Sequence, residues 1–179
     1  MDVSLTTERL ILRPQVEADI GALMRGLNDY EVTRFLTVVP YPYRQEDAEI
    51  WIAMQAPPAP GQAIFAIDLP GEGMIGAVSI EDELGYWLDR RFHGHGYMTE
   101  ASAALLSWHF AALPDDIVHS GAHVGNHASL NVQRKLGFIN AGTSMRHVRS
   151  QNREIEHIET ILARSDFEAA QHARMQRWM

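Results

Sequence analysis

The fold of this 179-residue chain is decided by one stretch, Arg91-Phe92-His93-Gly94-His95-Gly96-Tyr97-Met98-Thr99-Glu100-Ala101. It lies between a predicted strand at residues 83–88 and the clearest predicted helix, at residues 97–113, whose apolar residues recur at helical spacing. Gly94 and Gly96 allow a tight turn that leaves backbone N–H groups pointing outward. The helix start adds donors without partners and the positive end of a dipole. The loop therefore predicts an anion cradle suited to a pyrophosphate.

Two other interpretations of this loop remain open from the glycines alone. The pair is equally compatible with a plain strand-to-helix turn that binds nothing. The dinucleotide fingerprint G-x-G-x-x-G is incomplete, because Thr99 stands at the third glycine position. A nucleotide-binding oxidoreductase is therefore disfavoured.

The apolar spacing on both sides of the loop predicts one α/β domain spanning residues 1–179. We expect strands at residues 9–13, 63–69, 74–80, 83–88, 117–124, 138–148 and 154–162. We expect helices at residues 16–27, 45–55, 97–113 and 128–136. The tail at 165–179 has Phe167, Ala170, Arg174 and Trp178 at helical spacing. It is expected either to cap the domain or to join a homodimer.

The composition is that of an ordinary globular protein, with 46% apolar and 21% charged residues. The chain contains no cysteine, which excludes disulfides, cysteine-ligated metals and a cysteine nucleophile. Its net charge of −8 makes direct binding to nucleic acid unfavourable. We find no signal-peptide pattern, and no apolar run approaches the ~20 residues that span a bilayer. We therefore expect a cytoplasmic protein without membrane contact.

A second informative segment begins at Asn126 and ends at Phe138. Read as structure alone, Asn126 caps a helix and Gly137 ends it, with Phe138 folding back on Val132.

Taken together, the two segments resemble the GNAT N-acetyltransferase superfamily. Arg91-x-x-Gly94-x-Gly96 matches its R/Q-x-x-G-x-G/A acyl-CoA signature. Further segments resemble one branch, the ribosomal-protein N-acetyltransferases of the RimJ/RimL type. They are Thr-Glu-Arg-Leu-Ile-Leu-Arg-Pro (7–14), Glu-Leu-Gly-Tyr-Trp-Leu (83–88), Gly-Tyr-Met-Thr-Glu-Ala (96–101), Asn126-x-x-Ser129 and Lys-Leu-Gly-Phe (135–138).

The resemblance implies a fold and a reaction. The fold is a single mixed, mostly antiparallel sheet of about six or seven strands, flanked by helices and splayed between its fourth and fifth strands. Those strands are residues 83–88 and 117–124 here. The reaction is direct transfer of an acetyl group from acetyl-CoA to a primary amine, in a ternary complex and without a metal. The amine belongs to a protein N-terminus or to a small molecule.

The resemblance also assigns residues to the binding of acetyl-CoA. Backbone groups around Trp87 and Leu88 would hold the pantetheine arm. The N–H groups from Arg91 to Tyr97 would hold the pyrophosphate, which includes those of Phe92, His93, Gly94, His95 and Gly96. Asn126 would contact the arm near the fifth strand, and Ser129 would lie close to the sulfur.

Two residues are candidates for the chemistry, which needs a neutral amine and a partner for the leaving thiolate. Glu83 is the candidate base, although it could also be a solvated hairpin charge after Glu81 and Asp82. Many members of the superfamily carry a tyrosine acid seven residues after the asparagine, and that position is Gln133 here. Ser129 is the expected substitute, by a hydrogen bond to the sulfur. The competing interpretation gives Ser129 no chemical duty.

Several alternatives stay open. The absent tyrosine would also suit a non-catalytic acyl-CoA sensor. His119, His123 and His127 are four apart, but about 13 Å separates them along a strand, so a shared metal is not expected. The amine pocket is expected between the first two helices, the loop at 35–44 and the loop between the last two strands. Residues that could shape it are Tyr30, Tyr41, Tyr43, Arg34 and Arg44. A peptide N-terminus, a polyamine and an aminoglycoside-like amine all remain candidate acceptors.

Overall fold

The computed structural model describes residues 3–55 and 57–176. Its strands are β1 Leu5–Thr6, β2 Ile11–Arg13, β3 Ala63–Leu69, β4 Gly73–Ile80, β5 Leu84–Leu88, β6 Ile117–His123, β7 Ile139–Val148 and β8 Arg153–Ala163. Its helices are α1 Ile20–Leu27, α2 Tyr30–Thr33, α3 Gln45–Met54, α4 Tyr97–Ala112, α5 His127–Leu136 and α6 Arg164–Gln176. Two short 3₁₀ helices, Glu17–Asp19 and Arg90–Phe92, precede α1 and α4.

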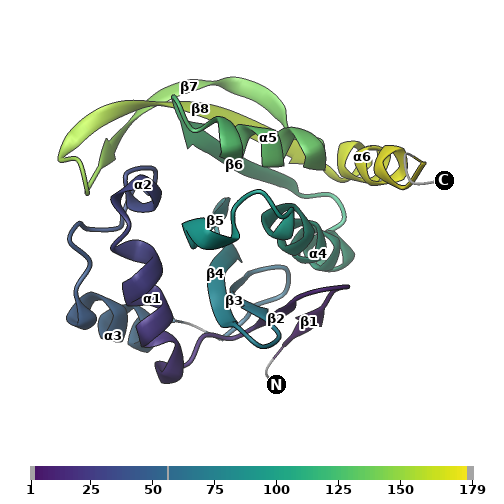
Figure 1. The fold of residues 1–179 in the computed structure, drawn as a ribbon. Helices are drawn as coiled ribbons and strands as arrows, with labels where there is room; N and C mark the ends of the chain where they lie inside the picture. The colour runs from purple at the N-terminus through teal and green to yellow at the C-terminus, as the bar shows by residue number, and fades with distance from the viewer. Residues whose placement is uncertain (1–2, 56, 177–179) are drawn as a thin grey trace.

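The strands form two hydrogen-bonded sheets. One has the order β1-β2-β3-β4-β5, the other the order β6-β8-β7, and neighbouring strands are antiparallel in both. Figure 1 shows the three-stranded sheet arching over the end of the five-stranded one, with β5 and β6 at the facing edges. The expected splay between residues 83–88 and 117–124 is therefore confirmed.

Two details of the sheet differ from the sequence-based expectation. The first predicted strand, at residues 9–13, is the second arm of a hairpin whose first arm, β1, was not predicted. Thr7 N–H bonds the Leu10 carbonyl at 2.9 Å, and this turn brings β1 onto β2. The splay also separates the strands into two sheets, since β5 and β6 share no ladder of hydrogen bonds. The Ser120 hydroxyl instead donates to the Leu84 carbonyl at 2.8 Å. This side-chain hydrogen bond joins the two sheets at the narrow end of the splay.

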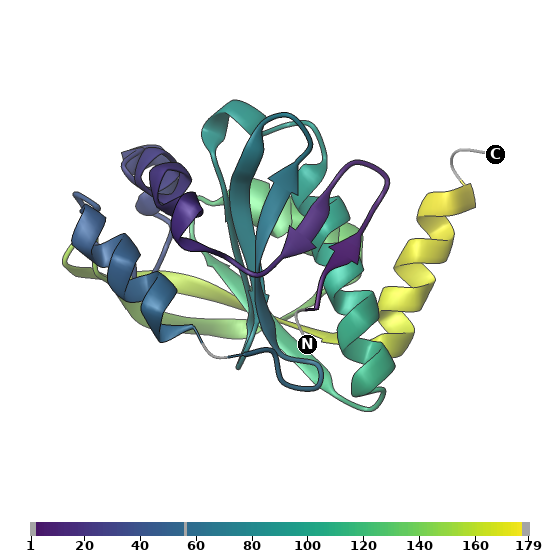
Figure 2. The same cartoon turned by 90° about the horizontal axis from the view of Figure 1, so that it is seen from below.

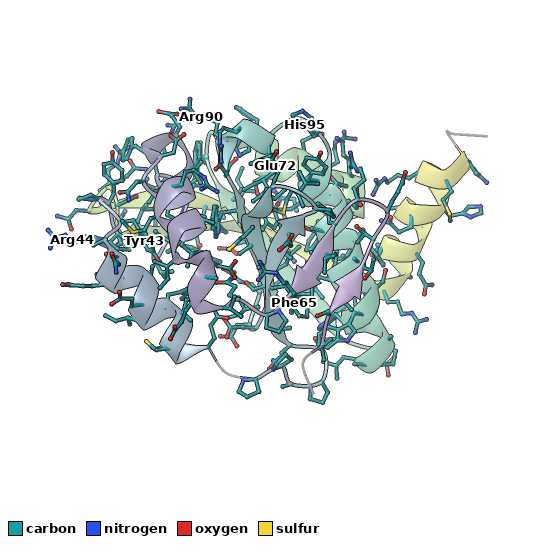
Figure 3. All side chains as sticks on the ribbon, turned by 60° about the horizontal axis from the view of Figure 1, so that its bottom comes forward. Tyr43, Arg44, Phe65, Glu72, Arg90 and His95 are labelled. Atoms are coloured by element: carbon teal, nitrogen blue, oxygen red, sulfur yellow. The ribbon has the colours of Figure 1, made fainter. Side chains whose placement is uncertain are left out.

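Helices cover both faces of the five-stranded sheet, as the view in Figure 2 shows. On one face, α4 packs over a cluster that includes Phe65 and Leu105, both fully buried. On the other, α1 and α3 pack over Ala66 and Ala77. Alternate residues of β3 thus enter different cores, as the two-residue period of a strand requires. Figure 3 shows Phe65 on this central sheet.

The remaining helices frame the two ends of the molecule. The short helix α2 was not expected from the sequence, and Asp29 caps it by accepting from Glu31 N–H at 3.0 Å. The tail forms α6, which buries Phe167 against Phe110 of α4 at a ring distance of 5.9 Å. Trp178 lies outside the described residues. Among the described helices, none is long and apolar enough to cross a membrane.

Candidate active site

A groove with a volume of about 760 Å³ follows the opening between the two sheets. Gly94, Gly96 and Tyr97 line one end of it. Val38 and Arg149, which belong to the loop after α2 and to the β7–β8 hairpin, line the other. Most of the predicted catalytic and cofactor-binding residues line this groove, whereas Arg91 and His95 lie outside its lining. The predicted residues in the lining are Glu83, Trp87, Leu88, Phe92, His93, Gly94, Gly96, Tyr97, Asn126 and Ser129.

The wall of the groove contains the free edge of β5. The Leu84 carbonyl points across the splay to Ser120, whereas the Trp87 carbonyl points back toward Gly76 of β4. Since backbone groups alternate sides along a strand, Tyr86 and Leu88 share the outward direction of Leu84. The Trp87 side chain still lines the groove, with its ring against Gly26 of α1.

In the loop from β5 to α4, fewer backbone N–H groups are free for a ligand than the sequence predicts. Gly94 and Gly96 both have φ of +80°, a conformation that favours glycine. Three of the predicted donors are already used: Arg91 N–H bonds the Asp89 carboxylate, and Phe92 and His93 bond carbonyls within the 3₁₀ turn. The N–H groups that remain for a ligand are those of residues 94–97 and of the first turn of α4.

Arg9 braces this loop from the first hairpin. Its guanidinium donates to the His95 carbonyl at 3.0 Å and forms an ion pair with Glu100 at 2.6 Å. It also lies 4.6 Å from the centre of the Tyr97 ring. Figure 3 shows His95 at the same edge of the molecule as Arg90. The contacts from Arg9 anchor the loop to α4 and to the first hairpin.

The Arg91 side chain is also occupied within the protein. It donates to Asp89 at 2.8 Å and 3.1 Å. Burial alone would raise the pKa of Asp89, but the hydrogen bonds from Arg91 outweigh burial and lower it. His93 donates from Nε2 to the Leu88 carbonyl at 2.8 Å, which ties the loop to β5. Arg91 and His93 therefore shape the loop.

Across the groove, Asn126 and Ser129 lie at the start of α5. The Asn126 side chain accepts from Ser129 N–H at 3.2 Å, which confirms the predicted cap, and Gly137 ends the helix with φ of +101°. The Ser129 hydroxyl is 2.8 Å from the Tyr86 hydroxyl and 3.2 Å from Nε2 of Gln133. Sequence reasoning missed Tyr86 as a partner of Ser129, because Tyr86 belongs to β5, 43 residues earlier in the chain.

Glu83 lies in the groove wall within a network of charged side chains. Arg146 of β7 donates to its two carboxylate oxygens at 2.8 Å and 3.1 Å, and also to Glu159 of β8 at 2.9 Å. Glu159 accepts in turn from His157 Nδ1 at 3.1 Å. Arg146 and this network fix the position of the Glu83 carboxylate.

His123 and His157 face each other across β6 and β8, with ring centres 5.0 Å apart. Burial and the neighbouring His157 lower the pKa of His123 to about 4, and burial and Arg146 lower that of His157. His119 and His127 are exposed, away from this pair. Within residues 3–55 and 57–176, no group of three or more metal-ligating side chains lies together.

The far end of the groove is closed by contacts between the β7–β8 hairpin and the segment around α2. Arg149 N–H bonds the Thr37 carbonyl at 2.9 Å, and Gln151 Nε2 bonds the Arg34 carbonyl at 2.8 Å. Tyr43 is buried in this region, and burial raises its pKa to about 12. Figure 3 shows Arg44 at the outer edge of the molecule beside it.

The other predicted pocket residues lie outside the lining of the groove. Tyr30 and Tyr41 pack on each other with ring centres 5.0 Å apart, and Arg34 pairs with Glu31. Apolar side chains line this end instead: Val32, Phe35, Leu36, Val38, Val39, Ile50, Trp51 and Met54. All of these residues except Val32 belong to the second predicted helix and the 35–44 loop, which the sequence analysis named as pocket walls, although it singled out the polar side chains there.

Comparison with known proteins gives a consistent picture. The family model for the acetyltransferase (GNAT) domain matches residues 9–139. An uncharacterized N-acetyltransferase, p20 of Bacillus licheniformis, is 25% identical over 163 residues, which cover 86% of this chain and 92% of that protein. Among solved structures, an acetyltransferase (GNAT family) from Bacillus anthracis superposes with a TM-score of 0.77 at 19% identity, covering 91% of this chain and 99% of that one. The ribosomal-protein-S5-alanine acetyltransferase from Vibrio fischeri gives 0.71 at 20% identity, covering 93% and 99%.

Proposed function

Because this chain belongs to the GNAT acetyltransferase family and is an N-acetyltransferase, we propose that it transfers the acetyl group of acetyl-CoA to a primary amine by direct attack. The observation that supports this most directly is the groove, which joins the glycine loop to the wall that holds Glu83 and Ser129. A donor could lie along one half of the groove while an acceptor approaches from the other.

The residues at the glycine loop suit the donor. A pyrophosphate requires several N–H groups that converge on one point, and the loop with the start of α4 offers them. The space that a Cβ at Gly94 would occupy is open, with no heavy atom within 4 Å. The free edge of β5 would receive the pantetheine arm at Leu88 and Tyr86, next to Trp87. Asn126 would approach the arm from the opposite side.

The chemistry needs a neutral amine and a stabilised thiolate. Glu83 would accept a proton from the substrate ammonium, directly or through a water, from the position that Arg146 gives its carboxylate. The amine nitrogen then bonds to the thioester carbon, and the carbon–sulfur bond breaks with its electron pair on sulfur. The Ser129 hydroxyl would donate a hydrogen bond to that sulfur.

The acceptor would enter beside the β7–β8 hairpin, where the groove is largely apolar. Trp51 and Met54 line this end together with Asp47, while Glu31 is paired with Arg34 and Arg149 also lines the groove. The charges at this end are therefore mixed and do not select the charge of the acceptor. A protein N-terminus is the acceptor class to test first, because solved structures of the same fold include ribosomal-protein acetyltransferases, while a polyamine and an aminoglycoside-like amine stay open. A cytoplasmic location and a homodimer through the tail stay predictions.

The test is an acceptor screen with the full chain. Acetyl-CoA is incubated with N-terminal peptides of ribosomal proteins, polyamines and an aminoglycoside, and both free thiol and product mass are measured. We expect thiol release together with a mass gain of one acetyl group on at least one amine. Tight binding of acetyl-CoA without turnover on any amine would instead identify a non-catalytic sensor. Absence of acetyl-CoA binding would overturn the proposal.

A further inference from the structure

Three polar side chains meet in the groove wall at the point where β5 and α5 converge. The Tyr86 hydroxyl lies 2.8 Å from the Ser129 hydroxyl, and Gln133 Nε2 lies 3.2 Å from it. Tyr86 and Ser129 are 43 residues apart in the chain, so this meeting depends on the tertiary fold. Gln133 is almost fully buried, with 1% of its surface exposed.

The orientation of the Gln133 amide follows from its neighbours. Nε2 lies 2.7 Å from the Gly121 carbonyl, which can only accept a hydrogen bond, so the NH₂ group faces Gly121. The amide oxygen then faces the Thr160 hydroxyl, which donates to it at 2.8 Å. The second N–H of the amide lies 3.2 Å from the Ser129 oxygen and 3.5 Å from the Tyr86 oxygen, so its shorter contact is with Ser129.

The same count of donors and acceptors applies to Ser129. A hydroxyl has two lone pairs and one hydrogen. Gln133 fills one lone pair, and Tyr86, at 2.8 Å, is placed to fill the other. With both lone pairs filled, the hydrogen of Ser129 is left to point into the groove. Burial raises the pKa of Tyr86, so its hydroxyl stays protonated and remains a donor at neutral and moderately alkaline pH.

We propose that Tyr86 and Gln133 are positioning residues that turn the hydrogen of Ser129 toward the sulfur of the bound thioester. The inference rests on the proposed function and deepens it. When the amine nitrogen bonds to the carbonyl carbon, the carbon–sulfur electron pair moves to sulfur. Ser129 stabilises this thiolate through its hydrogen bond, and the thiolate takes a proton from water afterwards. The proton lost by the amine leaves through Glu83 or solvent.

This arrangement explains how the site works with glutamine at position 133. Gln133 cannot supply a phenolic proton, but its amide directs the serine. A phenol does contact Ser129, but it comes from Tyr86 of β5 and approaches the serine from the other side. A different pattern, in which Ser129 donates to Tyr86 and Tyr86 to the Ser129 carbonyl at 3.2 Å, would leave sulfur without a donor. The test separates the two patterns.

The decisive variant is Tyr86→Phe, which keeps the ring in the groove wall and removes only the hydroxyl. We expect kcat to fall about tenfold while the Kd of acetyl-CoA and the KM of the amine change less than about twofold. In a Ser129→Ala background, Tyr86→Phe should have no further effect on kcat, because its partner is gone. Equal losses in both backgrounds, or no loss in the wild-type background, would overturn the proposal.

A second readout needs no turnover. The hydrogen bond from Ser129 should lower the pKa of the thiol of bound CoA, followed by the ultraviolet absorbance of the thiolate. Tyr86→Phe and Gln133→Met should each raise that pKa toward the value of free CoA. Ser107→Ala, which removes an exposed hydroxyl of α4 that does not line the groove, is the matched control and should leave the thiol pKa unchanged. An unchanged pKa in Tyr86→Phe contradicts the inference.

The outcomes also distinguish this inference from the proposed function. A wild-type protein that does not bind CoA overturns both. A wild-type protein that acetylates an amine, with additive effects of Tyr86→Phe and Ser129→Ala, overturns the inference alone.

Discussion

At the scale of single residues, the glycine loop depends on backbone conformations that other residues rarely adopt. Gly96 has φ of +80° immediately before α4, so its peptide group sets the direction of the first helical N–H groups. A β-branched residue at such an angle is a steric outlier. The cradle is therefore sensitive to a change that adds only a few carbon atoms.

Gly96→Val tests this loop. We expect acetyl-CoA to bind at least about tenfold more weakly, or about 1.4 kcal/mol, because the side chain strains the turn and distorts the donors. Isothermal calorimetry measures the affinity. Gly142→Val is the matched control, since Gly142 has φ of +122° on the exposed strand β7 and does not line the groove. Unchanged affinity in a folded Gly96→Val protein would show that the cradle is elsewhere.

Glu83→Gln tests the base at the same scale. The variant should keep the affinity for acetyl-CoA and lose a factor of about 10² in turnover at neutral pH, because the proton acceptor is removed. The acidic limb of the pH–rate profile should flatten as well. Glu81→Gln, an exposed neighbour, is the control. Wild-type rates for Glu83→Gln at pH 7 would mean that the ammonium loses its proton to solvent, and would remove Glu83 from the catalytic residues.

At the scale of elements, the β7–β8 hairpin builds the acceptor end of the groove by its contact with α2. Ser150 donates to the Thr33 carbonyl at 3.2 Å, and Gln151 donates to the Arg34 carbonyl at 2.8 Å. These two bonds join the second sheet to the helices that cover the first. The hairpin therefore forms one wall of this end of the groove, where we propose that the acceptor binds.

The double variant Ser150→Ala with Gln151→Ala should loosen that wall. Two hydrogen bonds worth about 1 kcal/mol each are lost, so we expect the KM for the amine to rise roughly tenfold. The Kd of acetyl-CoA should not change, because the glycine loop lies at the other end of the groove. Glu154→Gln, exposed on the same hairpin, serves as the control. A rise in the Kd of acetyl-CoA in place of the KM would contradict this division of the groove.

At the scale of the whole molecule, polar contacts inside the splay join the two sheets. Ser120 bonds Leu84 at the narrow end, and Arg146 of the second sheet pairs with Glu83 beside β5. Close to this junction His123 and His157 are buried as neutral rings. The free energy of unfolding should therefore depend on pH through the protonation of these two histidines.

The direction of that dependence follows from His123. Its pKa is about 4 in the folded protein and about 6.5 in the unfolded chain. Between these values the unfolded chain binds a proton that the folded protein does not, so the free energy of unfolding falls as the pH falls from about 6.5 to about 4. The loss from this group amounts to at most about 3 kcal/mol. His157, whose pKa is also lowered, adds a loss of the same sign.

Urea unfolding of wild type and His123→Gln across this pH range measures the effect. Gln can keep a hydrogen bond to Thr37, which His123 contacts at 3.1 Å. We expect a shallower loss of stability in His123→Gln. His119→Asn, exposed on the same strand, should retain the slope of the wild type. Identical slopes for His123→Gln and wild type would show that His123 binds its proton over the same pH range in the folded and the unfolded protein, and would contradict the prediction.

The sequence predicts local structure well, whereas contacts between residues far apart in the chain depend on the tertiary fold. Periodicity and turn chemistry were sufficient to predict α4, α5 and the central strands, and Asn126 and Gly137 predicted both ends of α5. These features depend on neighbours within a few residues, whose side chains and backbone angles are readable in order. The motifs around Arg91 and Asn126 were likewise sufficient to indicate the family, because each is a short continuous segment.

The contacts that define the site depend on the tertiary structure and could not be predicted from the sequence. The Tyr86–Ser129 contact joins residues 43 apart, and the Arg146–Glu83 pair joins residues 63 apart. The use of the Arg91, Phe92 and His93 N–H groups inside their own turn also depends on three-dimensional geometry. Residue types set what a side chain can donate or accept, whereas the packing of two sheets across a splay decides which partner it meets. That choice depends on the free energy of the whole fold, which no short segment contains.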